Sequence, residues 1–266
     1  MGRMKPAESV DDVLTAEQRA VMARVLAEEA SRREHIVVYL SGAHAYGFPS
    51  PDSDLDLKAI HIAKTADLLG FDVPPPTSDR AEIIDGVEID YTSNELAHAL
   101  LGILSGNGNF LERVLGRMTA TASPVLDEVR PLARRALSRR VHRHYRGFAQ
   151  NQLRFLEQEP TAKKLLYVLR TATTGIHLLS AGELEPDLTR LMDRYDLADA
   201  AELVERKRAG ERVGLDPALL EAWRPRIDAL FARLDAALET SPLPEAPPNE
   251  RELREWLMAV RRARFA

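Results

Sequence analysis

The stretch "SGAHAYGFPSPDSDLDLKAIHI", residues 41–62, is the most informative part of this sequence. Its first half is a turn punctuated by glycine and proline, and its second half alternates polar and apolar residues, which predicts a strand with one buried face. One face of that strand carries Asp54, Asp56, Lys58 and Ile60, because successive side chains point to opposite sides. Two carboxylates on one face repel each other unless a positive charge lies nearby, and that charge is commonly a metal ion.

The segments on either side of this stretch predict a small α/β unit. An almost wholly apolar run at residues 35–42 predicts a buried strand, and a capping box of Thr15 and Gln18 opens a predicted helix through about residue 33. Residues 71–82, "FDVPPPTSDRAE", predict a stiff, solvent-facing loop, because three consecutive prolines favour an extended conformation. A third short strand, "GVEIDYT", is expected after that loop.

Capping patterns predict two helices after the third strand. Thr92 and Glu95 are spaced as a capping box for a helix that stops at Gly106. Asn109 and Glu112 have the same spacing and predict the start of the next helix, so Glu112 is more simply explained as a capping residue than as a catalyst.

From Pro124 onward the sequence shows only helical periodicity, with Pro131 expected to kink or restart the first helix. A Pro-rich linker at residues 240–249 precedes the final predicted helix. The predicted fold class is therefore α/β (α+β). It consists of a domain with a short mixed sheet over residues 1–122 and an all-α domain over residues 123–266.

Composition restricts the classes of protein that fit. The chain has 266 residues, a formal net charge of −5 and no cysteine, which excludes disulfides, thiolate zinc sites and cysteine nucleophiles. It contains no apolar run long enough to span a membrane and no P-loop motif. We therefore expect a soluble, cytoplasmic protein with no membrane partner.

A metal site for phosphoryl chemistry needs a third carboxylate on a neighbouring strand. Two Mg²⁺ ions about 3.5–4 Å apart can stabilise the attacking and leaving oxygens together, and each takes only one or two protein carboxylates. Asp90, in "VEIDYTS", is the candidate, and Glu88, two residues earlier on the same side of the strand, is its rival.

The turn before the two aspartates is suited to hold an anion. Gly42 allows close backbone approach, and exposed N–H groups in such a turn form an anion-binding concavity. Ser53 is placed to reach a phosphate, although serine before aspartate is also common turn chemistry.

The segment "SGAHAYGFPSPDSDLDL" closely resembles the h-G-S…D-x-D motif of the DNA polymerase beta nucleotidyltransferase superfamily. More narrowly, it is similar to bacterial predicted nucleotidyltransferases of the RNA-ligase-associated polymerase-beta-like group. The likeness continues through residues 85–116 and, more loosely, through 144–153, 163–171 and 202–211. It therefore covers most of the chain, with its most specific block at the aspartate pair.

This resemblance implies transfer of a nucleoside monophosphate from an NTP to a hydroxyl acceptor, with two Mg²⁺ ions for which Mn²⁺ can substitute. Asp54 and Asp56 carry over as catalytic metal ligands, and Asp90 as the third ligand, which also activates the hydroxyl. Association with an RNA ligase is the partner that the resemblance implies. The chain departs from the motif at Ala43, which stands where the family has a serine that touches the phosphates.

Residues predicted to bind the nucleotide come from the turn and from one later helix. Positions i, i+4 and i+7 of that helix form one face, and basic side chains there could neutralise the leaving pyrophosphate. A pair of lysines covering an apolar helix is the alternative explanation. The predicted set is Gly42, Ala43, His44, Ser53, Lys163, Lys164, Tyr167 and Arg170.

The run between Glu128 and Glu157 contains no acidic residue but eight arginines, which suggests a phosphate-bearing partner inside an acidic protein. We predict that Arg139, Arg140 and Arg143 bind nucleic acid, with RNA as the favoured acceptor. A solvated helix face explains the run equally well.

Some assignments stay open at this level. Tyr46 could stack on a base or pack under the turn, and Lys207 with Arg208 could bind phosphate but is better explained as a surface pair. The acceptor could also be a protein or a small alcohol. A non-catalytic relative that binds nucleotide or RNA is the rival function.

Overall fold

The computed structural model describes residues 6–210 and 214–265. The ends of the two predicted domains, residues 1–5 and 266, lie outside this range. The chain forms two compact units that interleave along the sequence. The sheet unit comprises Ser9–Ser41, Asp54–Leu137 and Ala246–Ala266, and the helical unit comprises Met1–Glu8, Gly42–Ser53 and Ser138–Glu245. The predicted domain boundary after residue 122 stays a prediction.

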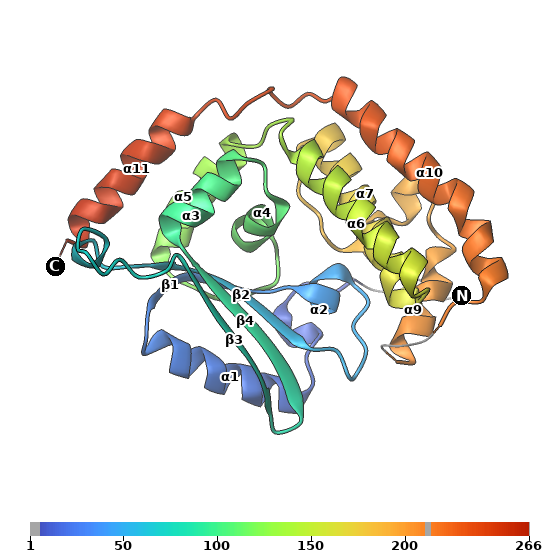
Figure 1. Cartoon of the computed structure of the whole chain (residues 1–266), viewed down its shortest axis with the longest axis horizontal. Coiled ribbons are helices and arrows are strands. Elements are labelled where there is room, and N and C mark those ends of the chain that lie inside the picture. Colours follow the sequence, from blue (N-terminus) through green and yellow to red (C-terminus); the bar gives the residue numbers. More distant parts are fainter. Residues whose placement is uncertain (1–5, 211–213, 266) are drawn as a thin grey trace. The chain divides into compact units, whose positions relative to one another are not determined.

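The sheet unit is built on a mixed sheet, which confirms the predicted fold class (Figure 1). Within the described residues the sheet has five strands in the order β3-β4-β2-β1-β5. β2 and β4 are parallel, and the other neighbouring pairs are antiparallel. The strands are β1 (Glu34–Leu40), β2 (Leu55–Ile62), β3 (Thr77–Ile84), β4 (Val87–Glu95) and β5 (Thr119–Ala122).

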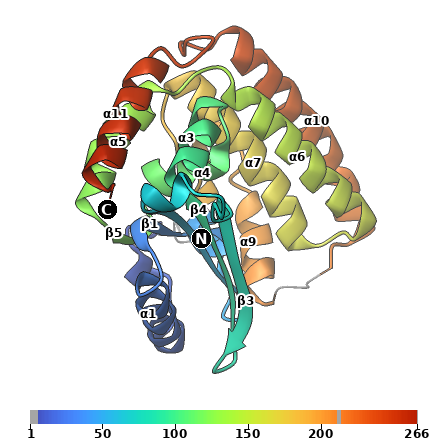
Figure 2. The same cartoon turned by 60° about the vertical axis from the view of Figure 1, so that its left-hand side comes forward.

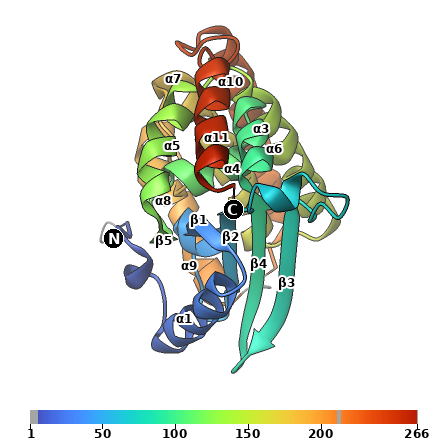
Figure 3. The ribbon, with the colours of Figure 1, turned by 90° about the vertical axis from the view of Figure 1, so that its left-hand side faces the viewer.

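Helices cover both sides of this sheet. α1 lies on one side, while α3, α4 and α5 lie on the other, and α11 packs against α3 (Figure 3). The capping box of Thr15 and Gln18 at the start of α1 is confirmed. The helices of this unit are α1 (Ala16–Ala30), α3 (Leu96–Leu104), α4 (Gly108–Leu115), α5 (Pro124–Arg135) and α11 (Glu250–Ala263), with short 3₁₀ turns at Val10–Asp12 and Ala66–Leu68.

The apolar face of β2 and β4 lies in the core. Leu55, Leu57 and Tyr91 are fully buried, so the alternation read from the sequence corresponds to one buried and one partly open face. Burial of each such side chain stabilises the fold by about 1.5–3 kcal/mol, which fixes the strand register.

The strand β3 corrects the prediction of a loop over residues 71–82, because the segment from Thr77 onward pairs with β4 along its whole length. Asp85 and Gly86 join the two strands with φ values of 50° and 82°, the positive values that a two-residue hairpin turn requires. The three prolines end before the strand begins, so they shape only the loop ahead of it.

The two predicted helix caps after β4 are wrong in position. β4 continues through Glu95, whose own carboxylate accepts from the Ala97 N–H and caps α3, so Thr92 lies inside the strand. Asn107, and not Asn109, caps α4. Pro131 lies within α5, which runs through it to Arg135.

The helical unit is built around α7 (Ala162–Ala181), which contacts α6 (Val141–Gln158), α9 (Ala200–Arg208) and α10 (Pro217–Glu239) (Figure 2). Gly175 allows α7 to pack closely, since a Cβ there would lie 2.7 Å from the Tyr145 Cβ. The unit also holds α2 (Gly42–Tyr46), α8 (Leu188–Leu191) and a 3₁₀ turn at Asp193–Tyr195. The helices and linker predicted after residue 124 are confirmed where the chain is described. Within residues 6–210 and 214–265, no helix is long and apolar enough to cross a membrane.

Candidate functional site

The three predicted catalytic aspartates lie in the sheet unit at the start of two parallel strands. Asp56 on β2 pairs in register with Asp90 on β4, so the two carboxylates leave the same face from neighbouring strands. Asp54 directly precedes β2, two residues before Asp56. The side chains of Asp56 and Asp90 are 28% and 53% exposed, so a ligand in solution can reach both.

Lys58 contacts two of these carboxylates, a role that the sequence alone did not predict. Its Nζ is 2.8 Å from Asp90 Oδ2 and 3.9 Å from Asp56 Oδ1, and it also donates to the Asp90 carbonyl oxygen at 3.3 Å. The positive charge expected between the aspartates is therefore supplied in this structure by an ammonium group. The strand alternation had already placed Lys58 on this face, which was the available signal.

The residues fit a magnesium site in the chemical kind of their donors. Carboxylate oxygens are the ligands that Mg²⁺ prefers, and the register brings Asp56 and Asp90 together. In residues 6–210 and 214–265, however, no group of three or more histidine or carboxylate side chains is arranged to hold a metal ion. The Lys58 ammonium is bound to Asp90, so an ion that uses this carboxylate has to displace it.

The rival carboxylate, Glu88, lies one residue before Ile89, the first β4 residue paired with β2. It is exposed. Only Asp90 has a carboxylate directly opposite it on β2.

The turn that precedes the aspartates forms a short buried helix in the helical unit. Gly42 has a φ of 65°, a value that favours glycine. All residues of α2 are buried, including Ala43 and His44, which corrects the expectation of a turn with exposed N–H groups. Gly47, with a φ of 88°, packs so closely that a Cβ would lie 2.0 Å from Asp187 Oδ1.

Two of the residues predicted to bind nucleotide pack against this turn. The Arg170 guanidinium lies 3.6 Å from the centre of the Tyr46 ring and is buried. Tyr167 packs edge-on against Tyr46 and Phe48, with ring centres 5.6 and 5.7 Å apart. Tyr46 is therefore a packing residue in this structure, and Arg170 holds the turn to α7 by a cation–π contact.

Lys207 anchors the other end of the same turn, and its assignment to a surface pair is wrong. The side chain is fully buried, and its Nζ donates to Ser50 Oγ at 2.5 Å and to Ser53 Oγ at 2.6 Å. The helical period contained the signal, because Leu203, Val204 and Lys207 lie on the buried face of α9. Ser53 directly precedes Asp54, so Lys207 fixes the residue at which the chain enters the carboxylate site.

The predicted lysine pair begins α7. Both side chains are half-buried, and Lys164 forms an ion pair with Glu159 at 2.6 Å. Because both residues belong to the helical unit, they lie in the same compact body as the turn over residues 42–53.

The arginines predicted to bind nucleic acid separate into two groups. Arg139 donates to the carbonyl oxygens of Ser241 at 2.7 Å and Leu243 at 3.0 Å, so it holds the Pro-rich linker. Arg140 and Arg143 are exposed.

Arg140 and Arg143 belong to one exposed face that extends along α6. Positions 140, 143, 147, 151 and 154 follow the helical repeat and carry Arg140, Arg143, Gly147, Asn151 and Arg154, all of them exposed. The face spans about 21 Å at 1.5 Å per residue. We call it the α6 arginine face.

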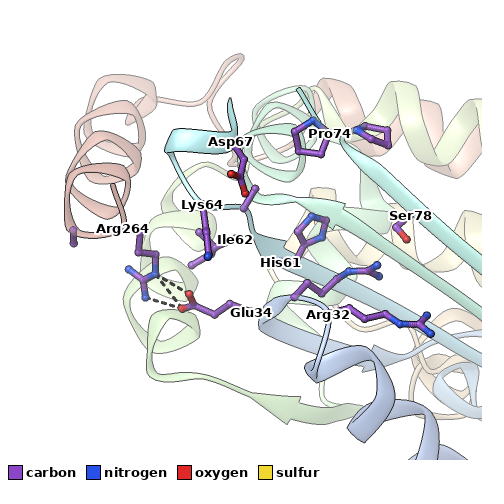
Figure 4. Close-up of a pocket in the computed structure, with 13 residues that line it drawn as sticks. Arg32, Glu34, His61, Ile62, Lys64, Asp67, Pro74, Ser78 and Arg264 are labelled. Atoms are coloured by element: carbon purple, nitrogen blue, oxygen red, sulfur yellow. Dashed lines mark hydrogen bonds and ion pairs between the residues drawn. The ribbon is translucent and has the colours of Figure 1, made fainter. Parts of the chain in front are cut away.

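A separate cavity of about 580 Å³ lies in the sheet unit, at the opposite end of β2 from the aspartates (Figure 4). Arg33, His61, Lys64 and Arg264 are among its lining residues. Burial, followed by the charge of Arg33, lowers the pKa of His61, and its Nδ1 lies 2.7 Å from Ser93 Oγ. Arg264 is bound to Glu34, and Arg33 to Glu29, so acidic partners compensate most of the positive charge of the cavity.

The sequence as a whole matches the family described as RNA repair pathway DNA polymerase beta family (RlaP), over residues 18–259. The chain belongs to this family. Together with the fold, the family indicates a nucleotidyltransferase, which confirms the resemblance seen at the aspartate pair.

Two uncharacterized proteins align with most of the chain. The uncharacterized protein MJ0002 of Methanocaldococcus jannaschii is 30% identical over 212 residues, covering 77% of this chain and 84% of that protein. The uncharacterized protein YcgL of Bacillus subtilis is 27% identical over 211 residues, covering 75% and 76%. A crystal structure of a nucleotidyltransferase-like protein from Exiguobacterium sibiricum aligns with 93% of this chain and 80% of its own, with 12% identity and a TM-score of 0.33, too low to add to the family match.

Proposed function

We propose that this protein is a Mg²⁺-dependent nucleotidyltransferase that moves a nucleoside monophosphate from an NTP to a hydroxyl at an RNA end. The observation that carries the proposal is the register of β2 and β4, which sets Asp56 opposite Asp90 with Asp54 two residues before. The family, whose description names an RNA repair pathway, supports the choice of RNA.

Each aspartate has a separate task in this proposal. Two Mg²⁺ ions, or Mn²⁺ in their place, would supply the positive charge that stabilises the attacking and leaving oxygens. Asp54 and Asp56 would hold these ions. Asp90, the more exposed carboxylate of the register pair, would also accept the proton of the attacking hydroxyl.

The nucleotide would be held by the turn and the start of α7. The Ser53 hydroxyl and the ammonium groups of Lys163 and Lys164 are the proposed phosphate contacts. Tyr167 and Arg170, which pack on Tyr46, would act by fixing the turn and not by touching the base.

The α6 arginine face is the proposed acceptor-binding surface. Its three arginines lie on one helix face, and phosphates of a single strand are attracted to such a surface without regard to base sequence. An RNA ligase that acts on the same ends in the cytoplasm is the partner implied by the proposal.

The proposal is tested by incubating pure protein with RNA and each of the four labelled NTPs, with and without Mg²⁺. We expect Mg²⁺-dependent labelling of RNA that Asp54→Ala and Asp56→Ala abolish, at unchanged or higher melting temperature, because each change removes one of several like charges at the start of β2. Asp79→Asn, at an exposed aspartate on β3, is the matched control and should keep full activity. Binding of NTP and RNA by the wild type without any labelling would replace the proposal with a non-catalytic role.

A further inference from the structure

Lys58 contacts two of the carboxylates that the proposed metal ions would use, Asp56 and Asp90. We propose that Lys58 is a resident counter-ion of this site: a divalent metal has to displace its ammonium group, so Lys58 weakens metal binding until a nucleotide is present. This inference rests on the proposed function, since it concerns the same aspartates.

The geometry places the ammonium between two strands. Lys58 follows Asp56 by two residues on the same face of β2, and its Nζ reaches across to Asp90 Oδ2 on β4 at 2.8 Å. The same Nζ also donates to the Asp90 carbonyl oxygen at 3.3 Å and lies 3.9 Å from Asp56 Oδ1. Lys58 is only 19% exposed, so solvent screens this charge less than it would a surface ion pair.

A metal and the ammonium cannot share these oxygens. Mg²⁺ binds carboxylate oxygens at about 2.0–2.1 Å and demands near-octahedral geometry. An ion at that distance from Asp90 would lie within a few ångströms of the Lys58 Nζ, and the two positive charges would repel each other. Metal binding at Asp90 therefore requires the lysine side chain to move away.

The charge balance shows when this exchange becomes favourable. The formal charges of Asp54, Asp56, Asp90 and Lys58 sum to −2, so these four side chains together compensate one divalent ion. A second ion would make the nucleotide-free site positive. A bound triphosphate reverses this balance, and it offers the displaced ammonium a new anionic partner. The triphosphate therefore favours full metal loading, and Lys58 adds one positive charge to the repulsion that the triphosphate has to offset.

The test measures Mn²⁺ binding to the nucleotide-free protein by electron paramagnetic resonance titration, with Mn²⁺ as the probe. We expect Lys58→Met to bind Mn²⁺ about 10- to 30-fold more tightly than the wild type, the effect of removing one unit charge about 4 Å from a divalent ion in a water-like dielectric. Lys58→Arg keeps the charge and should bind like the wild type. Lys64→Met, at an exposed lysine two residues beyond β2, is the matched control and should change nothing.

Two further measurements keep the outcome decisive. With a non-hydrolysable NTP analogue, the affinity advantage of Lys58→Met should shrink to less than about threefold, because the triphosphate then offsets the ammonium in the wild type. Without metal, Lys58→Met should melt at a lower temperature than the wild type, and Mn²⁺ should restore it, since the facing carboxylates lose their counter-ion.

Equal Mn²⁺ affinity in wild type, Lys58→Met and Lys64→Met would overturn the inference and leave the proposed function standing. An absence of Mn²⁺ binding in all three proteins, with and without the NTP analogue, would instead overturn the proposed metal chemistry. The two failures are therefore distinguishable.

Discussion

Two lysines, one in each compact unit, illustrate two ways in which a protein accommodates a partly or fully buried ammonium. Lys58 in the sheet unit is 19% exposed and is bound by the carboxylate of Asp90, while Lys207 in the helical unit is fully buried and donates to the hydroxyls of Ser50 and Ser53. The partners of Lys58 are the carboxylates of Asp56 and Asp90, which a metal ion can also bind. Lys207 has no exposed surface and donates to two buried hydroxyls of the turn, so this lysine is a structural anchor.

The surroundings of the two lysines are specified at different ranges of sequence. The carboxylate site follows from strand alternation and the register of β2 with β4, which involve residues 32–34 positions apart. The turn is held by side chains that come from much further along the chain, since Lys207 follows Ser53 by 154 residues. The carboxylate site thus depends on residues close in the sequence, whereas the turn that precedes it is held by residues far apart in the sequence.

Asp90 should give the largest effect on the sheet side of this comparison. Asp90→Asn should lower the transfer rate by about 10²–10⁴, the loss typical of removing a general base, whereas Glu88→Gln should lower it less than about threefold. The measurement is the single-turnover rate of label transfer for both variants. An inactive Glu88 variant beside an active Asp90 variant would mean that the register of β4 does not select the catalytic carboxylate.

Lys207 tests the helical side. Lys207→Met removes the donor to two buried hydroxyls, so we expect a loss of about 1–3 kcal/mol in the free energy of unfolding. Arg208→Met is the matched control at the next residue, where the side chain is exposed and paired with Glu205, and it should change stability by less than about 0.5 kcal/mol. Urea unfolding of both variants decides the matter. Equal losses of unfolding free energy in Lys207→Met and Arg208→Met would contradict the anchoring role of Lys207.

A histidine in each unit makes stability depend on pH. Burial, followed by the charge of Arg33, lowers the pKa of His35 to about 4, and burial followed by Arg170 does the same for His144. Because the unfolded chain takes up these protons near pH 6.5 and the folded chain only near pH 4, stability is complete above about pH 6.5 and falls as the pH drops toward 4.

We expect each histidine to account for roughly 1–2 kcal/mol of the stability lost between pH 7 and pH 5. Urea unfolding of His35→Gln and His144→Gln at the two pH values measures this difference. Each variant should lose less stability than the wild type on acidification. Parallel pH profiles for wild type and variants would contradict the assignment.

The α6 arginine face gives the smallest expected effect. With three phosphate contacts on a single strand, a fourfold rise in salt should weaken wild-type binding to RNA by about 20-fold. Arg140→Gln, Arg143→Gln and Arg154→Gln together should flatten the log–log salt slope by about 2. Arg251→Gln with Arg254→Gln, at exposed arginines of α11, is the control and should keep the wild-type slope. Filter binding at several salt concentrations would reveal an unchanged slope in the triple variant, which would remove this face as the RNA site.

Local patterns predicted the parts of the fold that depend on neighbouring residues. The alternation from Asp54 to His61, the cap at Thr15 and the helical character after residue 124 are all confirmed, because each is fixed by side-chain periodicity or a contact within one turn. The strand β3 was missed although the Asp85-Gly86 dipeptide is a strong hairpin signal, because the prolines before it suggested a longer loop.

The support of the site could not be predicted in this way. The stacking of Arg170 on Tyr46 joins residues 124 positions apart, and no periodicity relates them. The sequence pattern predicts Glu95 as the end of a capping box, but Glu95 ends β4, caps α3 and binds Arg261, three contacts that only the folded unit defines. Lys207 is intermediate between the two groups. The helical repeat predicts that its side chain lies on the buried face of α9, but it does not predict that Ser50 and Ser53 are its partners.

The contact between Glu95 and Arg261 also sets an order of events during synthesis. The Glu95 carboxylate is buried, and its guanidinium partner lies 166 residues further along the chain. At about 5–20 residues per second, a ribosome adds that partner roughly 8–33 s after Glu95. The five-stranded sheet in the described residues is complete in sequence by Ala122, yet it waits through the synthesis of most of the helical unit for α11. Nascent chains of this protein therefore hold the Glu95 carboxylate without its guanidinium partner for many seconds.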